Sequence, residues 1–219
     1  MRRWTRRASR VRLLIVAGVL AALFVPRSAP GTVAEQRARL PPAAECQDEV
    51  EGTWKAHVYS PRFDDWHVHT LYIHRVKDSE TALTGKMTAE VWDGGPQDQQ
   101  PPPCRGRTHY KVTMPSKGKV VNGQITFGGT SLRLDQVLCG RYVGYNIDNY
   151  AGRIEPERQE FQSINNDGGR AVNEPVVFRR IGCWDEAEQL PDPNVKVTPP
   201  AFYPKKERAG CGCSLPGAP

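Results

Sequence analysis

The histidines around residue 68 are the first side chains in this sequence that could carry chemistry. Trp66-His67-Val68-His69 forms part of an aromatic and β-branched stretch, and residues two apart on a strand point to one face of a sheet. The imidazoles of His67 and His69 could therefore share a metal ion, and His57 on the neighbouring strand with His74 or Asp65 nearby could complete the ligand set. His74 has the opposite parity, so the spacing alone predicts no three-histidine face. If His67 and His69 face a barrel interior, they could instead hydrogen-bond a ligand.

A second candidate is the polar stretch Asn165-Asn166-Asp167-Gly168-Gly169-Arg170-Ala171-Val172-Asn173-Glu174. Oxygen side chains around a Gly-rich bend can hold calcium, and Asp167 with Arg170 could form a recognition patch. The spacing does not match an EF-hand loop. Asn and Asp also serve turns by bonding their own backbone, so the favoured interpretation is a plain turn.

Motifs for nucleophilic or phosphate chemistry are missing from the sequence. It contains neither Gly-x-Ser-x-Gly nor a Gly-x-x-x-x-Gly-Lys loop. Acids such as Asp64, Asp65, Glu90 and Asp93 could pair in a cleft, but such neighbours arise by chance in a chain with 24 acidic residues. We therefore expect a protein without catalysis and without a cofactor.

The elements that must position these side chains are strands, because the apolar pattern between residues 52 and 181 has period two and is interrupted by Gly, Pro, Asn and Asp clusters. Turns are predicted at 115–118 and at Asn122-Gly123, among others. About eight short strands at close spacing predict an all-β fold, either an antiparallel up-and-down barrel or a β-sandwich. The predicted strands are Gly52–Ser60, Trp66–Val76, Leu83–Trp92, Thr108–Met114, Val120–Phe127, Ser131–Leu138, Tyr142–Ile147, Gln159–Ile164 and Val176–Ile181.

The first 34 residues have the layout of an export signal. A basic stretch through Arg12 precedes an apolar run from Leu13 to Val25, and small residues follow Pro26. That run is shorter than the roughly 20 residues that a membrane-spanning helix needs, so cleavage is favoured over permanent anchoring. Thr32-Val33-Ala34 is the best cleavage site, although an uncleaved signal anchor remains an alternative. The expected location is extracytoplasmic: periplasmic, at the cell surface or secreted.

The net charge of +6 belongs to this leader, which carries seven arginines and no acidic residue. The rest of the chain is close to neutral. A nearly neutral body does not predict binding to nucleic acid, and membrane contact is expected only through the leader if it stays uncleaved. The partners that remain are a small-molecule ligand or a component of the cell envelope.

The remaining chain divides into three parts. Residues 35–45 are polar with two prolines and suggest a linker. Residues 46–183 hold the strand pattern and form the predicted domain. Residues 184–219 are Pro-rich and charged, which is typical of a disordered tail, and its Cys211 and Cys213 receive no assigned role.

The four cysteines inside the domain predict two disulfides, because an exported chain meets an oxidising environment. Three pairings are possible. Cys46 and Cys183 flank the strand region and would join its two ends, which leaves Cys104 and Cys139 to pair. A zinc site is the alternative, but no Cys-x-x-Cys pair occurs.

Gly52-Thr53-Trp54 at the first strand, with Leu83-Thr84-Gly85 entering the third, resembles the opening of calycin barrels, which include lipocalins and avidins. In lipocalins this tryptophan packs across the closed end of the barrel against a basic residue of the last strand. The resemblance thus implies a secreted bacterial β-barrel in which Arg179 or Arg180 stacks on Trp54. It also implies an interior able to hold an apolar or amphipathic small ligand.

Together these features favour an exported, non-catalytic binding protein for a small ligand or a cell-surface component, with Trp54, His67, His69 and Arg179 as candidate ligand contacts. One alternative is a structural or interaction protein of the envelope with a filled core. A second is a metal-dependent hydrolase that uses His67 and His69. A cavity of several hundred cubic ångströms would favour ligand binding, whereas a filled interior would favour the interaction hypothesis.

Overall fold

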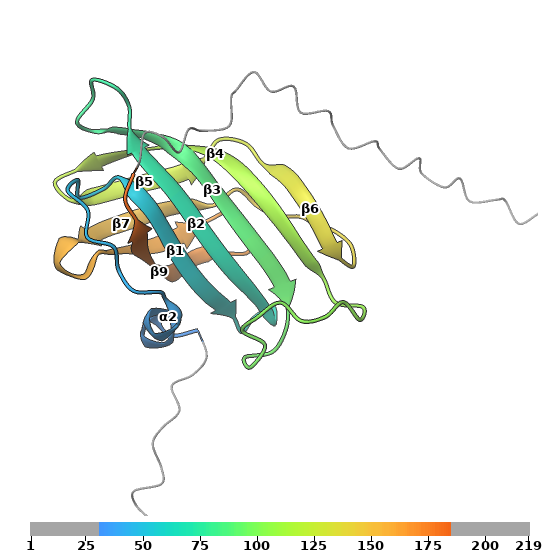
Figure 1. Ribbon diagram of the computed structural model, residues 1–219. Helices are drawn as coiled ribbons and strands as arrows, with labels where there is room; N and C mark the ends of the chain where they lie inside the picture. Colours follow the sequence, from blue (N-terminus) through green and yellow to red (C-terminus); the bar gives the residue numbers. More distant parts are fainter. Residues whose placement is uncertain (1–30, 185–219) are drawn as a thin grey trace, which may run out of the picture. The chain divides into compact units, whose positions relative to one another are not determined.

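The computed structural model describes residues 31–184, and within them the chain is almost entirely β-structure (Figure 1). The all-β prediction is therefore confirmed. In chain order the elements are α2 Val33–Arg39, β1 Gly52–Ser60, β2 Asp65–Arg75, β3 Ala82–Asp93, β4 His109–Val121, β5 Gln124–Gly129, β6 Arg133–Cys139, β7 Asn149–Glu155, the 3-10 helix η1 Pro156–Arg158, β8 Glu160–Asn166 and β9 Val172–Gly182.

Eight of these strands close into an antiparallel barrel. Neighbours around the ring are β1, β2, β3, β4, β5, β7, β8 and β9, and β9 pairs back onto β1. The ninth strand, β6, pairs only with the first half of β4, next to the place where β5 pairs with the second half. The barrel wall is therefore continuous beside the second half of β4, where β5 pairs with both β4 and β7. Beside the first half of β4, β6 is not paired with β7 and stands apart from it (Figure 1).

Strand β4 is longer than predicted, because the turn expected at 115–118 is part of the strand. The N–H and C=O of one residue in an antiparallel ladder point to the same neighbouring strand. The carbonyl of Pro115 accepts from the backbone N–H of Thr130, so the position of the missing proline N–H also faces the β5–β6 side. That is where the partner of β4 changes from β5 to β6, so the missing N–H of proline costs no ladder bond.

The chain reverses at Asn122-Gly123, where both residues have positive φ, as a tight hairpin requires.

The predicted strand Tyr142–Ile147 is also wrong, because these residues lie in a loop between β6 and β7. The strand follows instead at Asn149–Glu155, a segment whose Gly152 weakens the sequence signal for a strand. Glycine is needed there because a Cβ atom at this position would collide with the carbonyl oxygen of Gln162 on β8.

Alternation along the strands places one face of each in the barrel interior. Trp54, Leu71, Ile73, Phe161 and Phe178 are among the side chains that fill it. The exterior of β1–β3 carries a second apolar group, formed by Tyr59, Trp66 and Trp92. The indole N–H groups of Trp66 and Trp92 donate to carbonyls in the loop after β3, so this loop covers them.

The residues expected to form a linker, 35–45, contain most of the helix α2. Seven residues do not make a stable helix alone, so its stability comes from contacts with the barrel. Thr32 caps its first turn, and the buried Gln36 bridges two β9 backbone groups by accepting from Val177 and donating to Pro175. The predicted boundary between leader and linker, after Ala34, falls inside this helix. The leader up to residue 30 and the tail with Cys211 and Cys213 lie outside the described residues.

Two disulfides join distant parts of the chain. Cys46 is bonded to Cys183, with their Cα atoms 5.4 Å apart, and this bond connects the segment before β1 with the end of β9. Cys104 is bonded to Cys139 at a Cα separation of 5.3 Å and ties the β3–β4 loop to the end of β6. Both bonds indicate an oxidising, extracytoplasmic environment.

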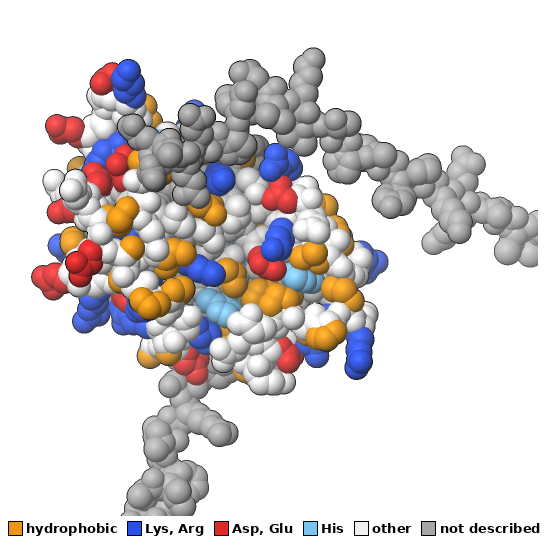
Figure 2. Space-filling view, viewed as in Figure 1, with side chains coloured by type: hydrophobic (Ala, Val, Ile, Leu, Met, Phe, Trp, Pro, Cys, Tyr) orange, Lys and Arg blue, Asp and Glu red, His pale blue; other side chains and the backbone are white. Residues whose placement is uncertain are grey.

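The outer face of β1–β3 carries acidic and basic side chains interspersed with apolar ones (Figure 2). Neither sign of charge covers a large area of that face. None of the helices among residues 31–184 is long and apolar enough to span a membrane.

Candidate functional site

The residues singled out by sequence lie at two opposite ends of the barrel. Trp54 is at the end where β1 begins and β9 finishes, and His67 and His69 are at the end where β1 turns into β2. We call the first the closed end and the second the mouth. Trp54 and Arg179 therefore do not share a site with the two histidines.

At the closed end Arg180, and not Arg179, takes the position expected from the barrel resemblance. Its guanidinium lies over the Trp54 ring, 5.1 Å from the centroid. It donates to the carbonyls of Asp48 and Glu51 and to the side-chain oxygen of Gln159, so buried acceptors surround it. Both side chains are almost fully buried, so Arg180 fills the closed end against Trp54.

Arg179, one residue earlier on β9, points to the opposite face of that strand. Its guanidinium donates to Glu160 at 2.8 Å, and Arg37 of α2 reaches the other oxygen of the same carboxylate, also at 2.8 Å. Arg179 also donates to the carbonyls of Leu40 and Pro41. These contacts hold the N-terminal segment on the barrel and give Arg179 a structural role.

At the mouth, the parity of β2 brings both histidines to the interior, with their rings stacked 5.6 Å apart. His57 and His74 lie outside: His57 packs on Trp66, and His74 stacks on Trp184. Burial, followed by the nearby charges of Arg39 and Lys55, lowers the pKa of His57 to about 4. The set of His57, His67 and His69 is therefore split between two faces of the sheet.

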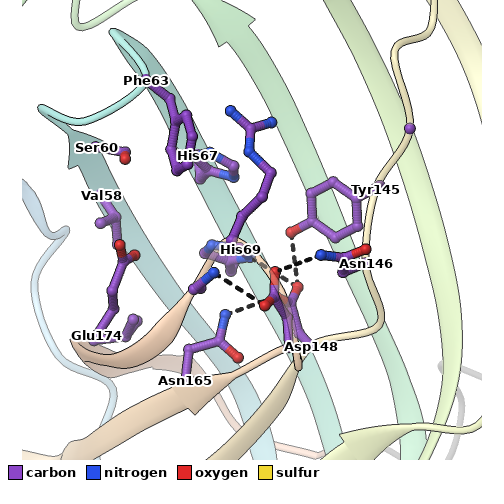
Figure 3. A pocket seen from close by; sticks show the side chains of 15 residues that line it. Val58, Ser60, Phe63, His67, His69, Tyr145, Asn146, Asp148, Asn165 and Glu174 are labelled. Carbon is purple, nitrogen blue, oxygen red and sulfur yellow. Dashed lines mark hydrogen bonds and ion pairs between the residues drawn. The ribbon is translucent and has the colours of Figure 1, made fainter.

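A cavity of about 50 Å³ lies beside the paired histidines. Its walls come from β1, β2, the loop between β6 and β7, the end of β8, the β8–β9 turn and the start of β9, and its side chains converge from these separate segments (Figure 3). The residues around it are Val58, Ser60, Phe63, His67, His69, Gly144, Tyr145, Asn146, Asp148, Asn165, Asp167, Arg170, Ala171, Glu174 and Val176.

Asp148 is the buried carboxylate of this cavity. Tyr145 donates its hydroxyl to one carboxylate oxygen at 2.7 Å, and the Asn165 amide donates to the other at 2.7 Å (Figure 3). Burial raises the pKa of Asp148 to about 6, although these two hydrogen bonds and the nearby His67 act in the opposite direction. The loop before β7 therefore supplies the central acid of the site, directly after the predicted strand Tyr142–Ile147.

His69 is only 5% exposed, and among the described residues it has no hydrogen-bond partner. Its closest polar neighbour is Asp148, with 3.6 Å between Nδ1 and a carboxylate oxygen. Burial, and then the proximity of His67 and His57, holds the pKa of His69 well below its usual value. The ring is thus neutral and leaves hydrogen-bonding capacity toward the cavity unused. The Tyr150 hydroxyl, buried nearby, also lacks a partner in the described part of the chain.

Arg170 and His67 both contact another acid of the mouth, Asp65. His67 Nε2 lies 3.1 Å from one oxygen of this buried carboxylate, and Arg170 donates to the other at 3.1 Å. The Arg170 guanidinium also stacks on Phe63, 3.8 Å from the ring centroid. Arg170 is thereby fixed at the rim.

Within the polar stretch 165–174, residues 167–171 form the turn between β8 and β9, while the residues on either side belong to those strands; the stretch also borders the cavity. Asp167 accepts from the backbone of Gly169 and Ala171 at 2.7 and 2.9 Å and from the Asn146 side chain at 3.2 Å. These bonds fix the turn. Glu174 follows on β9, and its pKa is raised by burial, with His67 and Arg62 acting in the opposite direction and the neighbouring acids adding to the rise.

Metal binding by these residues finds no geometric support. Within residues 31–184 no three His, Cys, Asp or Glu side chains are grouped so that they could hold a metal ion. His67 and His69 are stacked side by side, and the nearest acids to them already accept hydrogen bonds from Tyr145, Asn165 and Arg170.

Sequence reasoning missed Tyr145, Asp148 and the inward position of Asn165. The only local signal for the first two is a run of aromatic and Asn/Asp residues after Gly140, which resembles a strand and carries no chemical motif. Comparison with protein-family models gave no match, and neither did searches of curated proteins and of solved structures.

Proposed function

We propose that this protein is an exported, non-catalytic binding protein that takes a small polar ligand, or a small polar group of an envelope component, into the mouth of a filled barrel. The observation that carries the proposal is His69, which is 5% exposed, lines the cavity and has no hydrogen-bond partner among the described residues. Buried polar groups are normally satisfied, so an unpartnered one beside a cavity is a candidate contact for a ligand.

The size of the cavity decides which kind of ligand fits. One water molecule needs a cavity volume of at least about 10–15 Å³. A cavity of about 50 Å³ therefore accommodates only a few non-hydrogen atoms. An apolar ligand of the size that lipocalin-type barrels hold does not fit there. The binding hypothesis is therefore narrowed to a small polar group at the mouth.

A calycin-like ancestry of the barrel is part of this proposal. It is supported by Gly52-Thr53-Trp54 at the start of β1 and by Arg180 of the last strand over the Trp54 ring. Gly52 has a φ of +139°, and a Cβ atom there would collide with the Gly182 carbonyl, so this glycine is required where β1 approaches β9. Export to the periplasm, the cell surface or the medium agrees with the two disulfides.

The filled interior also supports the alternative of an envelope interaction protein without a small ligand. The two hypotheses differ in what the mouth histidines do. In the interaction hypothesis, water satisfies His69 and no small solute changes its environment.

The test is a titration of the full-length mature protein, with the histidine rings labelled with ¹⁵N and observed by NMR. The panel contains small polar solutes of four charge types: butylammonium, acetate, acetamide and glycine. We expect a saturable shift of the His67 and His69 ring signals with at least one of these solutes. In His69→Gln the remaining His67 signal should no longer shift, and in the exterior control His74→Gln both signals should still shift. If none of the panel shifts these signals, the binding proposal is wrong and the interaction hypothesis gains support.

A further inference from the structure

The charge balance around the mouth cavity is strongly one-sided. Four carboxylates line it or hold its rim: Asp65, Asp148, Asp167 and Glu174. Among the described residues that line the cavity, the only Lys or Arg is Arg170; Arg62, which does not line it, also acts on the charge of Glu174. An anion that enters this cavity meets uncompensated negative charge, whereas a cation is attracted.

The existing cation does not neutralise the inner acids. Arg170 is bound to Asp65 and stacked on Phe63, and its side chain is 42% exposed at the rim. His67 is also hydrogen-bonded to Asp65. Within residues 31–184, the carboxylate of Asp148 accepts hydrogen bonds from two neutral donors, Tyr145 and Asn165.

Glu174 is in a similar state, since the structure gives its carboxylate no hydrogen bond or ion pair within residues 31–184. It lines the cavity from β9 and is half-buried. Two carboxylates, one buried and one half-buried, are therefore without a cationic partner on the walls of one small cavity.

His69 is an independent indication of a ligand. Its neutral ring has one N–H donor and one acceptor nitrogen; it lines the cavity, and its Nδ1 lies 3.6 Å from a carboxylate oxygen of Asp148. A group with several N–H donors could bond both the carboxylate oxygens of this cavity and the acceptor nitrogen of the ring. The unpartnered histidine and the unpaired acids thus point to the same chemistry.

We propose that the mouth cavity binds a primary alkylammonium group, held by Asp148, Glu174 and His69. This inference rests on the proposed binding function and specifies its ligand. An ammonium group is compact and has three N–H donors, which matches two carboxylates and one imidazole acceptor. With about 50 Å³ available, the ammonium and the first carbons of its chain fit inside, and the remainder of the ligand extends into solvent.

The source of the ammonium group is either a free small amine or a lysine side chain displayed by a partner. The structure specifies the shared headgroup, and separate probes distinguish the sources. Butylammonium and 1,4-diaminobutane represent free amines. A Gly-Gly-Lys-Gly-Gly peptide with blocked termini represents a displayed lysine, and its Nζ-acetylated form is the control.

The experiment is a calorimetric and NMR titration of full-length mature protein with these probes, alongside butanol, butyrate and tetramethylammonium. We expect butylammonium to shift the His69 ring signals with a dissociation constant at least tenfold lower than that of butanol or butyrate. Tetramethylammonium, which has no N–H donor, should bind weakly. Glu174→Gln and Asp148→Asn should each weaken butylammonium binding about tenfold. Glu157→Gln removes an equal charge from an exposed position at the closed end and should leave binding unchanged.

Butyrate or butanol binding at His69 as tightly as butylammonium refutes the ammonium inference but leaves the proposed binding function intact. No histidine shift with any probe refutes both. Unchanged butylammonium affinity in the two acid variants, with thermal unfolding like that of wild type, also refutes the inference. Binding of the lysine peptide but not of free amines supports it and identifies a displayed lysine; the opposite pattern supports it and identifies a soluble amine.

Discussion

Replacing Arg180 by methionine should destabilise the barrel more than any other single substitution of a charged residue at the closed end. The side chain is 1% exposed, stacks on Trp54 and donates to Asp48, Glu51 and Gln159. Methionine fills much of the same volume but offers no donor, so the three acceptors lose their partner.

The size of the effect follows from these contacts. A buried acceptor left without a partner costs about 1–3 kcal/mol, and loss of the cation–π contact adds about 0.5–2 kcal/mol. Burial lowers the pKa of Arg180, which shows that the charge itself is costly to bury, so the gain from removing it offsets part of the loss. We expect a net destabilisation of about 3–5 kcal/mol.

Urea unfolding of the full-length mature protein, followed by far-UV circular dichroism, measures this directly. With a urea m-value of about 1–3 kcal/mol/M, the midpoint should fall by at least 1 M. The matched control is Arg158→Met, whose side chain is 61% exposed with one acid 3.6 Å away, and it should change stability by less than about 0.5 kcal/mol. If Arg180→Met stays within about 1 kcal/mol of wild type, the closed end is not held by this arginine.

Three further outcomes are expected. Burial raises the pKa of Asp148 to about 6 from an ordinary 3.8, so the folded state binds this proton more tightly than the unfolded state. The stability that this group contributes should therefore fall as pH rises from about 4 to 6. In Asp148→Asn, the free energy of unfolding measured across this pH range should lack that fall. Replacing both Cys46 and Cys183 by serine opens a loop of 137 residues and should lower stability by about 5 kcal/mol, which a large fall in melting temperature would show and an unchanged melting temperature would contradict. Gly52→Ala places a methyl group against the Gly182 carbonyl and should cost at least about 2 kcal/mol in the same urea assay; a cost below 0.5 kcal/mol would show that the β1–β9 contact yields easily.

Much of the wall was predictable from local patterns. Strand β1 begins and ends at the predicted residues, since Gly52 and the Pro61 turn bound a clean alternation. The full length of strand β4 was not predictable, because a proline such as Pro115 normally ends a central strand. Whether its missing N–H matters depends on the neighbour that faces it, and here that neighbour changes from β5 to β6.

The site shows the same division. The parity of His67 and His69 is a property of one strand, so their shared face could be inferred from spacing. The arrival of Asp148 beside His69 could not, because the two residues are 79 positions apart and meet only when the loop after β6 returns to the mouth.

The sequence by itself determined the all-β fold class, the face that each strand residue takes and the cysteines available for disulfides, because these follow from local periodicity and covalent chemistry. Only the tertiary structure decided that Arg180 and not Arg179 stacks on Trp54, that the interior is filled, and that acids gather around a buried, unpartnered His69. These features depend on how the closed barrel sets distances and burial between remote segments, and desolvation acts only on groups that closure has removed from water.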